Sequence, residues 1–125
     1  MGIQELLENL IYVELPSNGQ EISDELKTVN ETVTNKSDCD VIVDFTKVEI
    51  INSWNISNLL ILRSLLEEKG RQLILCNVCT ITKCVFVVAG LAGIFVFVDD
   101  KASALEIVKN AESLVSGNPS DHQDL

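Results

Sequence analysis

Two short apolar runs, separated by a stretch with helical spacing, restrict the fold of this chain more than any other feature. Residues 41–45 (VIVDF) are β-branched and nearly all apolar, and residues 72–78 (QLILCNV) repeat this character. Such runs are typical of strands in a parallel sheet whose two faces are both covered. Between them, residues 54–69 gather leucine and isoleucine on one helix face, and Gly70 ends the segment. A parallel sheet with helices packed against it is therefore predicted.

The rest of the sequence continues this alternation of strand and helix. The turn residues 16–19 (PSNG) end an opening strand, and an amphipathic segment with carboxylates on its outer face follows. The order implies an α/β fold with a small, mixed but mainly parallel sheet flanked by about four helices. The further elements are predicted as strands at residues 10–15 and 94–98, and as helices at residues 22–33, at residues 80–89 and from residue 102 onward.

The length of 125 residues fits one domain that buries its own core. No internal repeat divides the sequence, and we expect a single domain over residues 1–115. Residues 116–125 (SGNPSDHQDL) lack apolar periodicity and are predicted to form a flexible polar tail.

The acidic composition narrows the classes of partner. The chain has 19 Asp and Glu against 9 Lys and Arg, a formal net charge of -10, which repels nucleic-acid phosphates and anionic lipid headgroups. The apolar run at residues 84–98 is shorter than the ~20 residues that a membrane-spanning helix needs. The first ten residues carry carboxylates and no cationic start, so no targeting signal is predicted. We expect a cytoplasmic protein that binds no nucleic acid and does not insert into a membrane.

The four cysteines leave a second interpretation open. Cys76 and Cys79 form a C-x-x-C pair that could act in thiol redox chemistry or bind a metal. A structural zinc site needs about four ligands, and the single histidine, His122, lies in the polar tail. Buried, reduced cysteines are the favoured interpretation. Glycine-rich nucleotide loops and paired catalytic acids are also missing from the sequence, so we expect no enzyme activity, no cofactor and no metal.

The connection from the strand at residues 41–45 to the next helix is the candidate functional site. Asn52 and Ser53 stand at the predicted helix start, where unpaired backbone N–H groups and the helix dipole tolerate a phosphoryl group. Ser53 is predicted to cap the helix and is a candidate phosphoacceptor, two compatible roles. Trp54, the lone tryptophan, is either an anchor packed inside or an exposed hot spot for a partner. Ser57 lies one turn further on, as a solvated hydroxyl or a second hydroxyl of that surface.

Taken in order, these residues resemble a known family. Ile51-Asn52-Ser53 follows the buried strand, Gly90-Leu91 precedes the apolar run IFVFV, and residues 100–105 (DKASAL) lead into the last helix. This order is similar to that of the STAS domain, typified by bacterial anti-sigma factor antagonists, over roughly residues 10–110. The resemblance implies a small mixed sheet of about four or five strands flanked by helices, and a role in protein–protein switching.

The resemblance also implies a role for the helix start. In anti-sigma factor antagonists, a kinase-type anti-sigma factor phosphorylates a serine at the start of the second helix, and the unmodified form binds that factor and frees the sigma factor. Carried over, this position is Ser53. Asn52 stands where those antagonists usually have Asp, and Trp54 and Asn55 stand where small residues are common. Because of these departures, we expect the surface around Ser53 to act mainly in recognition of a partner, and less in chemistry at the Ser53 hydroxyl.

We therefore predict a non-catalytic regulatory module that binds a partner protein, such as an anti-sigma factor kinase. The predicted contact residues are Asn52, Ser53, Trp54, Asn55 and Ser57, with phosphorylation of Ser53 as an off switch. An alternative prediction assigns the same fold a different role. STAS domains also serve as accessory subunits of transport and lipid-trafficking complexes or as scaffold components. The partner is then a separate chain.

Overall fold

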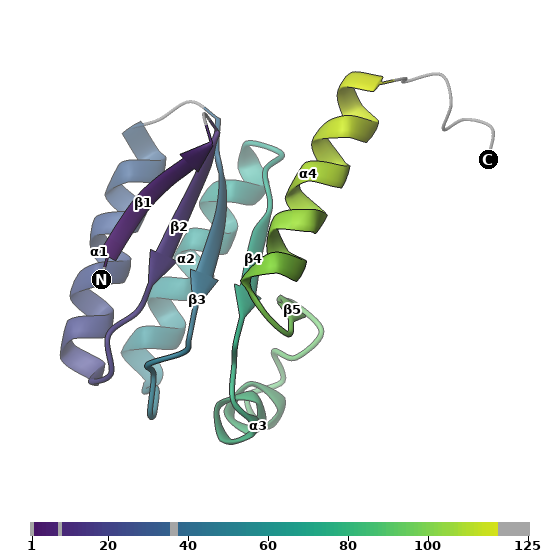
Figure 1. Ribbon diagram of the computed structural model, residues 1–125. Helices are drawn as coiled ribbons and strands as arrows, with labels where there is room; N and C mark the ends of the chain where they lie inside the picture. Colours follow the sequence, from purple (N-terminus) through teal and green to yellow (C-terminus); the bar gives the residue numbers. More distant parts are fainter. Residues whose placement is uncertain (1, 8, 36–37, 118–125) are drawn as a thin grey trace.

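Helices and strands alternate along the chain and build an α/β domain (Figure 1). The computed structural model describes residues 2–7, 9–35 and 38–117. The strands are β1 (Gly2–Leu7), β2 (Leu10–Glu14), β3 (Asp40–Asp44), β4 (Leu73–Cys76) and β5 (Val96–Val98). The helices are α1 (Gly19–Asn35), α2 (Ser53–Glu68), α3 (Thr80–Val88) and α4 (Lys101–Gly117).

The strands form one sheet in the order β1-β2-β3-β4-β5. Parallel pairing joins β2 to β3, β3 to β4 and β4 to β5, whereas β1 runs antiparallel to β2. This mixed, mainly parallel sheet confirms the predicted fold class. The sequence did not predict β1, because its segment GIQELL has no β-branched run and contains a glutamine and a glutamate. Pairing with its neighbour in the chain, β2, makes it a strand.

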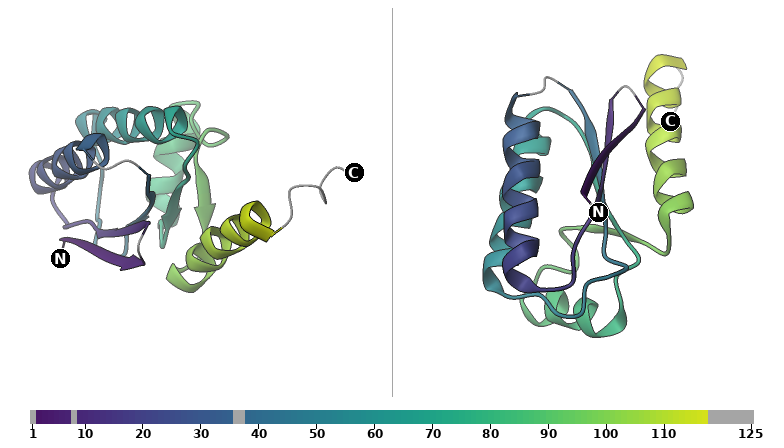
Figure 2. Two further views of the ribbon diagram at one scale, coloured as in Figure 1. Left: turned by 90° about the horizontal axis from the view of Figure 1, so that it is seen from above. Right: turned by 60° about the vertical axis from the view of Figure 1, so that its left-hand side comes forward.

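The sheet lies between two helical layers. Figure 2 shows α1 and α2 on one face of the sheet and α4 on the other. The side chains of β3 alternate between these layers: Val41 and Val43 belong to the core under α1 and α2, whereas Ile42 packs with Ala104 and Val108 of α4. Both faces of β3 are thus apolar, which explains the continuous apolar run in its sequence.

Several predicted boundaries shift by a few residues. β4 ends at Cys76, because Asn77 adopts a left-handed conformation with a φ of 58°. β5 is shorter than predicted, because residues 92–94 form a turn. α4 continues to Gly117, which includes the first two residues of the predicted polar tail, and residues 118–125 lie outside the described residues.

The apolar run at residues 84–98 is divided between α3, a turn and β5. Phe86 of α3 and Phe95 pack edge to face inside the domain, with ring centroids 5.4 Å apart. Across the described ranges, no helix is both long enough and apolar enough to cross a membrane.

An ion pair between the buried Asp40 and the partly exposed Arg71 joins the first residue of β3 to the residues directly before β4. Oδ1 of the buried Asp40 accepts hydrogen bonds from Arg71 Nε (3.1 Å) and from the Gln72 backbone N–H (2.8 Å). Its Oδ2 accepts a third from Arg71 Nη2 (3.0 Å). Because the guanidinium meets the carboxylate with two N–H groups, the pair has the bidentate geometry that offsets the cost of burying a charge.

We expect Asp40→Ala to lower the free energy of unfolding by about 3 kcal/mol, because the buried carboxylate accepts three hydrogen bonds and all three are lost. Urea unfolding followed by circular dichroism measures the change. Glu31→Ala removes an exposed carboxylate from α1 and should change stability by less than about 0.5 kcal/mol. Equal stability of the two variants would contradict this role of the pair.

Candidate functional site

Two asparagines form the start of α2. Asn52 is the N-cap residue, with an extended backbone (φ -124°, ψ 179°), and its Oδ1 accepts a hydrogen bond from the Asn55 backbone N–H (2.9 Å). In return, the Asn52 backbone N–H donates to Asn55 Oδ1 (2.9 Å), which completes a capping box. The prediction that Ser53 caps the helix is therefore wrong: Ser53 is the first helical residue, and Asn52 is the cap.

Asn55 also joins α2 to α1. Its Nδ2 donates to the Gly19 carbonyl (3.0 Å) and to Ser23 Oγ (2.8 Å), both in the first turns of α1. The side chain is fully buried, at 0% exposure. Asn55 therefore supports the site from inside, and the prediction that it contacts a partner needs correction.

The cap packs closely against the first residue of α1. A Cβ placed on Gly19 would lie 2.6 Å from Asn52 Nδ2, closer than two such atoms approach in proteins. A larger residue at this position would force the amide of Asn52, and with it the helix cap, to shift. Together with Asn55, this contact fixes the starts of α1 and α2 relative to each other.

Three predicted contact residues lie on the solvent side of this connection between the starts of α1 and α2. Ser53 and Ser57 are exposed, and within the described ranges the Ser53 hydroxyl makes no hydrogen bond. Trp54 is 72% exposed, which rules out the packed anchor and leaves the exposed aromatic. Its backbone carbonyl accepts a hydrogen bond from Asn58 Nδ2 (3.0 Å), so the helix turn that carries the indole is held in place.

A recess of about 220 Å³ lies beside Trp54, between the first turns of α1 and α2. The sequence did not indicate the part contributed by α1, because those residues belong to an ordinary amphipathic surface helix and only tertiary packing brings them to Asn52. The recess has room for a side chain of a partner. Its lining residues are Gly19, Gln20, Ser23, Lys27, Asn52, Trp54 and Asn58.

The segment that carries the site is almost free of charge. No Asp or Glu occurs between Ile50 and Leu66, and Arg63 is the only charged residue of this stretch. The first turn of α2 also has no acidic side chain to neutralise the positive end of its dipole. A chain with a net charge of -10 thus presents a partly apolar surface at this helix start, where α2 contributes no charge and Lys27 is the charged residue that lines the recess.

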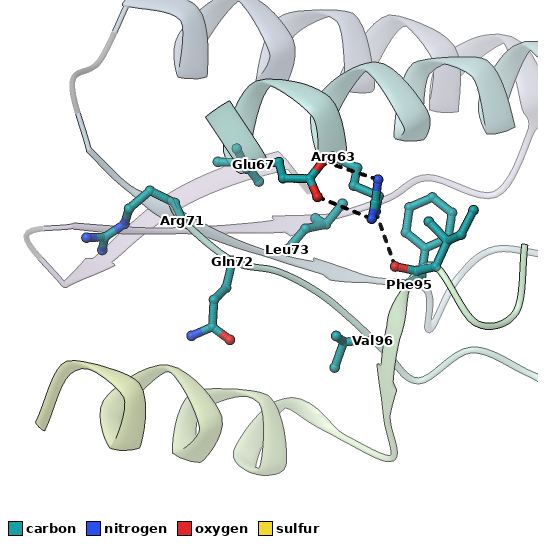
Figure 3. A pocket seen from close by; sticks show the side chains of 9 residues that line it. Arg63, Glu67, Arg71, Gln72, Leu73, Phe95 and Val96 are labelled. Atoms are coloured by element: carbon teal, nitrogen blue, oxygen red, sulfur yellow. Dashed lines mark hydrogen bonds and ion pairs between the residues drawn. The ribbon is translucent and has the colours of Figure 1, made fainter. Parts of the chain in front are cut away.

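A second hollow, of about 180 Å³, lies at the other end of α2 beside β4 and β5 (Figure 3). Arg63 Nε donates to the Ile94 carbonyl (3.2 Å), and its Nη1 lies 3.4 Å from Glu67 Oε1. The other arginine of the hollow, Arg71, binds Asp40. Both guanidinium groups therefore hold elements of the domain together, and the recess beside Trp54 is the better candidate for binding.

The STAS domain model matches residues 9–104, which is more than three quarters of the sequence. The chain belongs to the STAS domain family. The match begins just before β2 and ends in α4, so it contains the whole candidate site. No curated protein matches the sequence at a significant level.

Solved structures with the same fold include several STAS proteins. An RsbS variant from Moorella thermoacetica superposes with a TM-score of 0.76 at 14% identity, covering 88% of this chain and 95% of that one. The anti-sigma factor antagonist SpoIIAA in its unphosphorylated form gives a TM-score of 0.74 at 14% identity, covering 86% and 95%. A sulfate transporter family protein from Wolinella succinogenes gives 0.68 at 19% identity, covering 90% and 93%. At these identities the likeness establishes the shared fold.

Asp44, at the end of β3 in this STAS domain, is the centre of a polar cluster. Its Oδ1 accepts hydrogen bonds from Thr46 N (2.8 Å), Thr46 Oγ1 (2.6 Å) and Asn77 Nδ2 (3.1 Å), and its Oδ2 accepts one from the Tyr12 hydroxyl. Burial raises the pKa of Asp44, but these hydrogen bonds outweigh it and hold the pKa below its ordinary value. Lys101 Nζ lies 4.2 Å from the centroid of the Tyr12 ring. The carboxylate is therefore a hydrogen-bonded structural group at the end of its strand.

The cysteines of the C-x-x-C pair differ in environment. Cys76 is buried, and burial, together with the charges of Asp44 and Asp100, raises the pKa of its thiol to about 12. Cys79 is exposed at the start of α3, and Cys84 is exposed on the same helix. The prediction of buried cysteines holds for Cys39 and Cys76 and is wrong for the other two. With one thiol held protonated at neutral pH, the pair is poorly suited to redox chemistry.

We expect Asn55→Ala to lower the free energy of unfolding by about 2–3 kcal/mol, because buried backbone and hydroxyl groups lose their partners. Ser57→Ala, an exposed position on the same helix, is the matched control and should cost less than about 0.5 kcal/mol. Hydrogen exchange should locate the loss of protection in the first turns of α1 and α2. A uniform effect, or none, would contradict the linking role of Asn55.

Tyr12, the only tyrosine of the chain, should ionise well above its ordinary pKa of about 10. Burial raises the pKa of Tyr12, and the hydrogen bond to Asp44 and its negative charge raise it further. The stabilisation by the neutral phenol is complete below pH ~10 and is lost as the pH rises through the higher pKa of the folded state. Phenolate absorbance during a pH titration measures this, and Asp44→Asn should bring the transition to lower pH. A midpoint at the ordinary value in both proteins would contradict the buried hydrogen bond.

Proposed function

We propose that this STAS domain is a bacterial regulatory module that acts by binding a partner protein and not by catalysis. The exposed indole of Trp54 is the observation that carries the proposal. Tryptophan is enriched among the residues that dominate binding energy at protein interfaces, and here it stands on a helix start that buried hydrogen bonds hold rigid. Docking would cover Asn52, Ser53, Trp54 and Ser57 and fill the adjacent recess.

The partner class that we propose is an anti-sigma factor kinase. The fold of SpoIIAA, described as an anti-sigma factor antagonist, supports this class. SpoIIAA is also known in a phosphorylated form, which supports a phosphoacceptor in this fold. In this chain Ser53 is the exposed hydroxyl at the first position of α2, where the N-terminal N–H groups favour a negative charge.

Phosphorylation of Ser53 would act as an off switch. A phosphoserine carries about -1.5 to -2 charges, and docking would have to desolvate this charge on a helix start whose own side chains are uncharged. Asn52 adds no charge beside Ser53, because its side chain is a neutral amide, and its Oδ1 already accepts the hydrogen bond of the helix cap. We infer that the unmodified form binds and the phosphorylated form is released, and that this takes place in the cytoplasm, where four free cysteines remain reduced.

A second candidate function keeps the docking surface and changes the partner. The fold likeness to a sulfate transporter family protein supports a role as an accessory or scaffold subunit of a transport or signalling complex. The docking surface would then bind another part of that complex, and Ser53 would not need to be modified.

We expect Trp54→Ala to weaken binding to an anti-sigma factor kinase from the same genome by at least about tenfold, because a hot-spot residue contributes more than about 1.4 kcal/mol. Ser53→Asp should weaken binding to a similar extent, whereas Ser53→Ala should bind like the unmodified protein. Isothermal titration calorimetry measures these affinities. Mass spectrometry after incubation with the kinase and ATP should find the phosphate on Ser53 and not on Ser57.

Ser64→Asp is the matched control, because it adds the same charge at an exposed position about three turns further along α2. It should bind like the unmodified protein. If Ser53→Asp and Ser64→Asp bind equally well, Ser53 is not the switch. If Trp54→Ala also has no effect, the docking surface itself is wrong.

A further inference from the structure

Helix α3 leaves most of its apolar side chains in contact with solvent. Of its nine residues, only Thr82 and Phe86 are buried. Ile81 is 69% exposed and Val88 is 87% exposed. Since removing apolar surface from water is favourable by roughly 25 cal/mol per Å², an apolar face left open on an otherwise well-packed domain marks an interaction surface.

Three of the exposed residues of α3 form a continuous stripe. Cys84 is two positions from each of the buried residues Thr82 and Phe86, so it projects from the opposite side of the helix. Ile81 and Val88 are three and four positions from Cys84, the spacing that places side chains on one face. Ile81, Cys84 and Val88 are called the α3 stripe below.

The α3 stripe lies in the longest part of the chain without a carboxylate. Residues 69–98 contain Lys69, Arg71 and Lys83 but no Asp or Glu, although the whole chain has a net charge of -10. Lys83, the only charge on α3, lies with its Nζ 6.0 Å from the centroid of the Phe97 ring, away from the stripe. Two copies can therefore approach through α3 without the repulsion between carboxylates that α1 would bring.

The order of residues in the stripe suits a twofold axis. Ile81 and Val88 are β-branched residues at its two ends, and the small Cys84 is near its centre. In an antiparallel pair of α3 helices, Ile81 of one copy lies against Val88 of the other, and the two Cys84 side chains face each other. This self-complementary arrangement is what a twofold interface requires.

We propose that the α3 stripe is the interface of a twofold-symmetric homodimer of this domain. The occupant of the exposed face is a second copy of the chain, because the stripe matches itself and because α3 is free of the negative charge that keeps copies apart elsewhere. A helix of nine residues buries less than the ~800 Å² per partner of a standard interface, so the dimer is weak and forms at high protein concentration. The proposal shares no residue with the docking surface around Trp54.

The native cysteines test the arrangement without any added label. Packed helices with axes about 8–10 Å apart leave facing Cα atoms roughly 3.5–5.5 Å apart, which overlaps the separation found in disulfides. Diamide accepts the two protons and two electrons released when two thiols form a disulfide. It should therefore link Cys84 of one copy to Cys84 of the other and give a covalent dimer on a non-reducing gel.

Cys79 provides the matched control. It is also exposed, but at the start of α3 and outside the stripe, and hydrogen bonding with Thr82 lowers the pKa of its thiol. Random collisions would therefore link Cys79 at least as fast as Cys84. We expect Cys79→Ser to form the dimer as the unmodified protein does, and Cys84→Ser to form it at least ten times more slowly. Equal rates for the two variants would overturn the proposal.

Sedimentation velocity under reducing conditions tests the interface independently. The unmodified protein should shift from monomer toward dimer as its concentration rises, and Val88→Asp should stay monomeric. Ile61→Asp places the same charge on an exposed apolar position of α2 and should dimerise normally. An unmodified protein that stays monomeric at every concentration would overturn the proposal, as would equal behaviour of the two Asp variants. If Val88→Asp does not fold, the cysteine comparison still decides the outcome.

Discussion

The buried carboxamide of Asn55 is the interaction on which the candidate site depends. It accepts a hydrogen bond from the Asn52 backbone and donates to Gly19 and Ser23, so one side chain connects the starts of two helices. Because no water is needed to satisfy these groups, the connection is dry and stiff. The first turn of α2, which carries the exposed Ser53 and Trp54, is therefore already ordered before a partner binds. This lowers the entropic cost of association.

Charge is distributed unevenly over the domain, and this decides which surfaces can associate. Acidic side chains are concentrated outside the stretch from Ile50 to Val98, where Glu67 and Glu68 are the only carboxylates. The α3 stripe and the α2 residues around Trp54 both belong to this stretch. The residues that α1 contributes to the recess beside Trp54 lie outside it, but none of them is acidic. The negative charge elsewhere keeps the protein soluble and directs contact to these surfaces.

The sequence predicted the parts of the fold that depend on local pattern. The α/β class was predicted from the apolar runs of β3 and β4, from the helical spacing of α2 and from the alternation of the remaining segments. Strands that are buried on both faces of a sheet are apolar along their whole length, so they can be identified from sequence alone. The strand β1 was missed because its pairing with β2 makes it a strand and its own residues do not. The start of α2 near Asn52 and Ser53 was also predicted, since helix starts have a local polar signature. That this helix start is the functional site stays a prediction.

The chemistry within the site could not be predicted in the same way. Which of Asn52 and Ser53 caps the helix depends on a shift of one residue in the helix start, and local pattern does not resolve such a shift. The burial of Asn55 depends on Gly19 and Ser23 of α1, which are more than thirty residues away in the chain. The exposure of Cys79 and Cys84 likewise follows from the way α3 packs, since the sequence of α3 is apolar on every side except Lys83 and its threonines.

The single tryptophan has a practical consequence for the study of this domain. Since Trp54 is the only indole and stands in solvent on the proposed docking surface, its fluorescence reports the occupation of that surface alone. A bound partner that covers the ring would move the emission to shorter wavelength. Unfolding, in contrast, changes the surroundings of this ring little, so the optical signals of binding and of folding are separated by the position of one side chain.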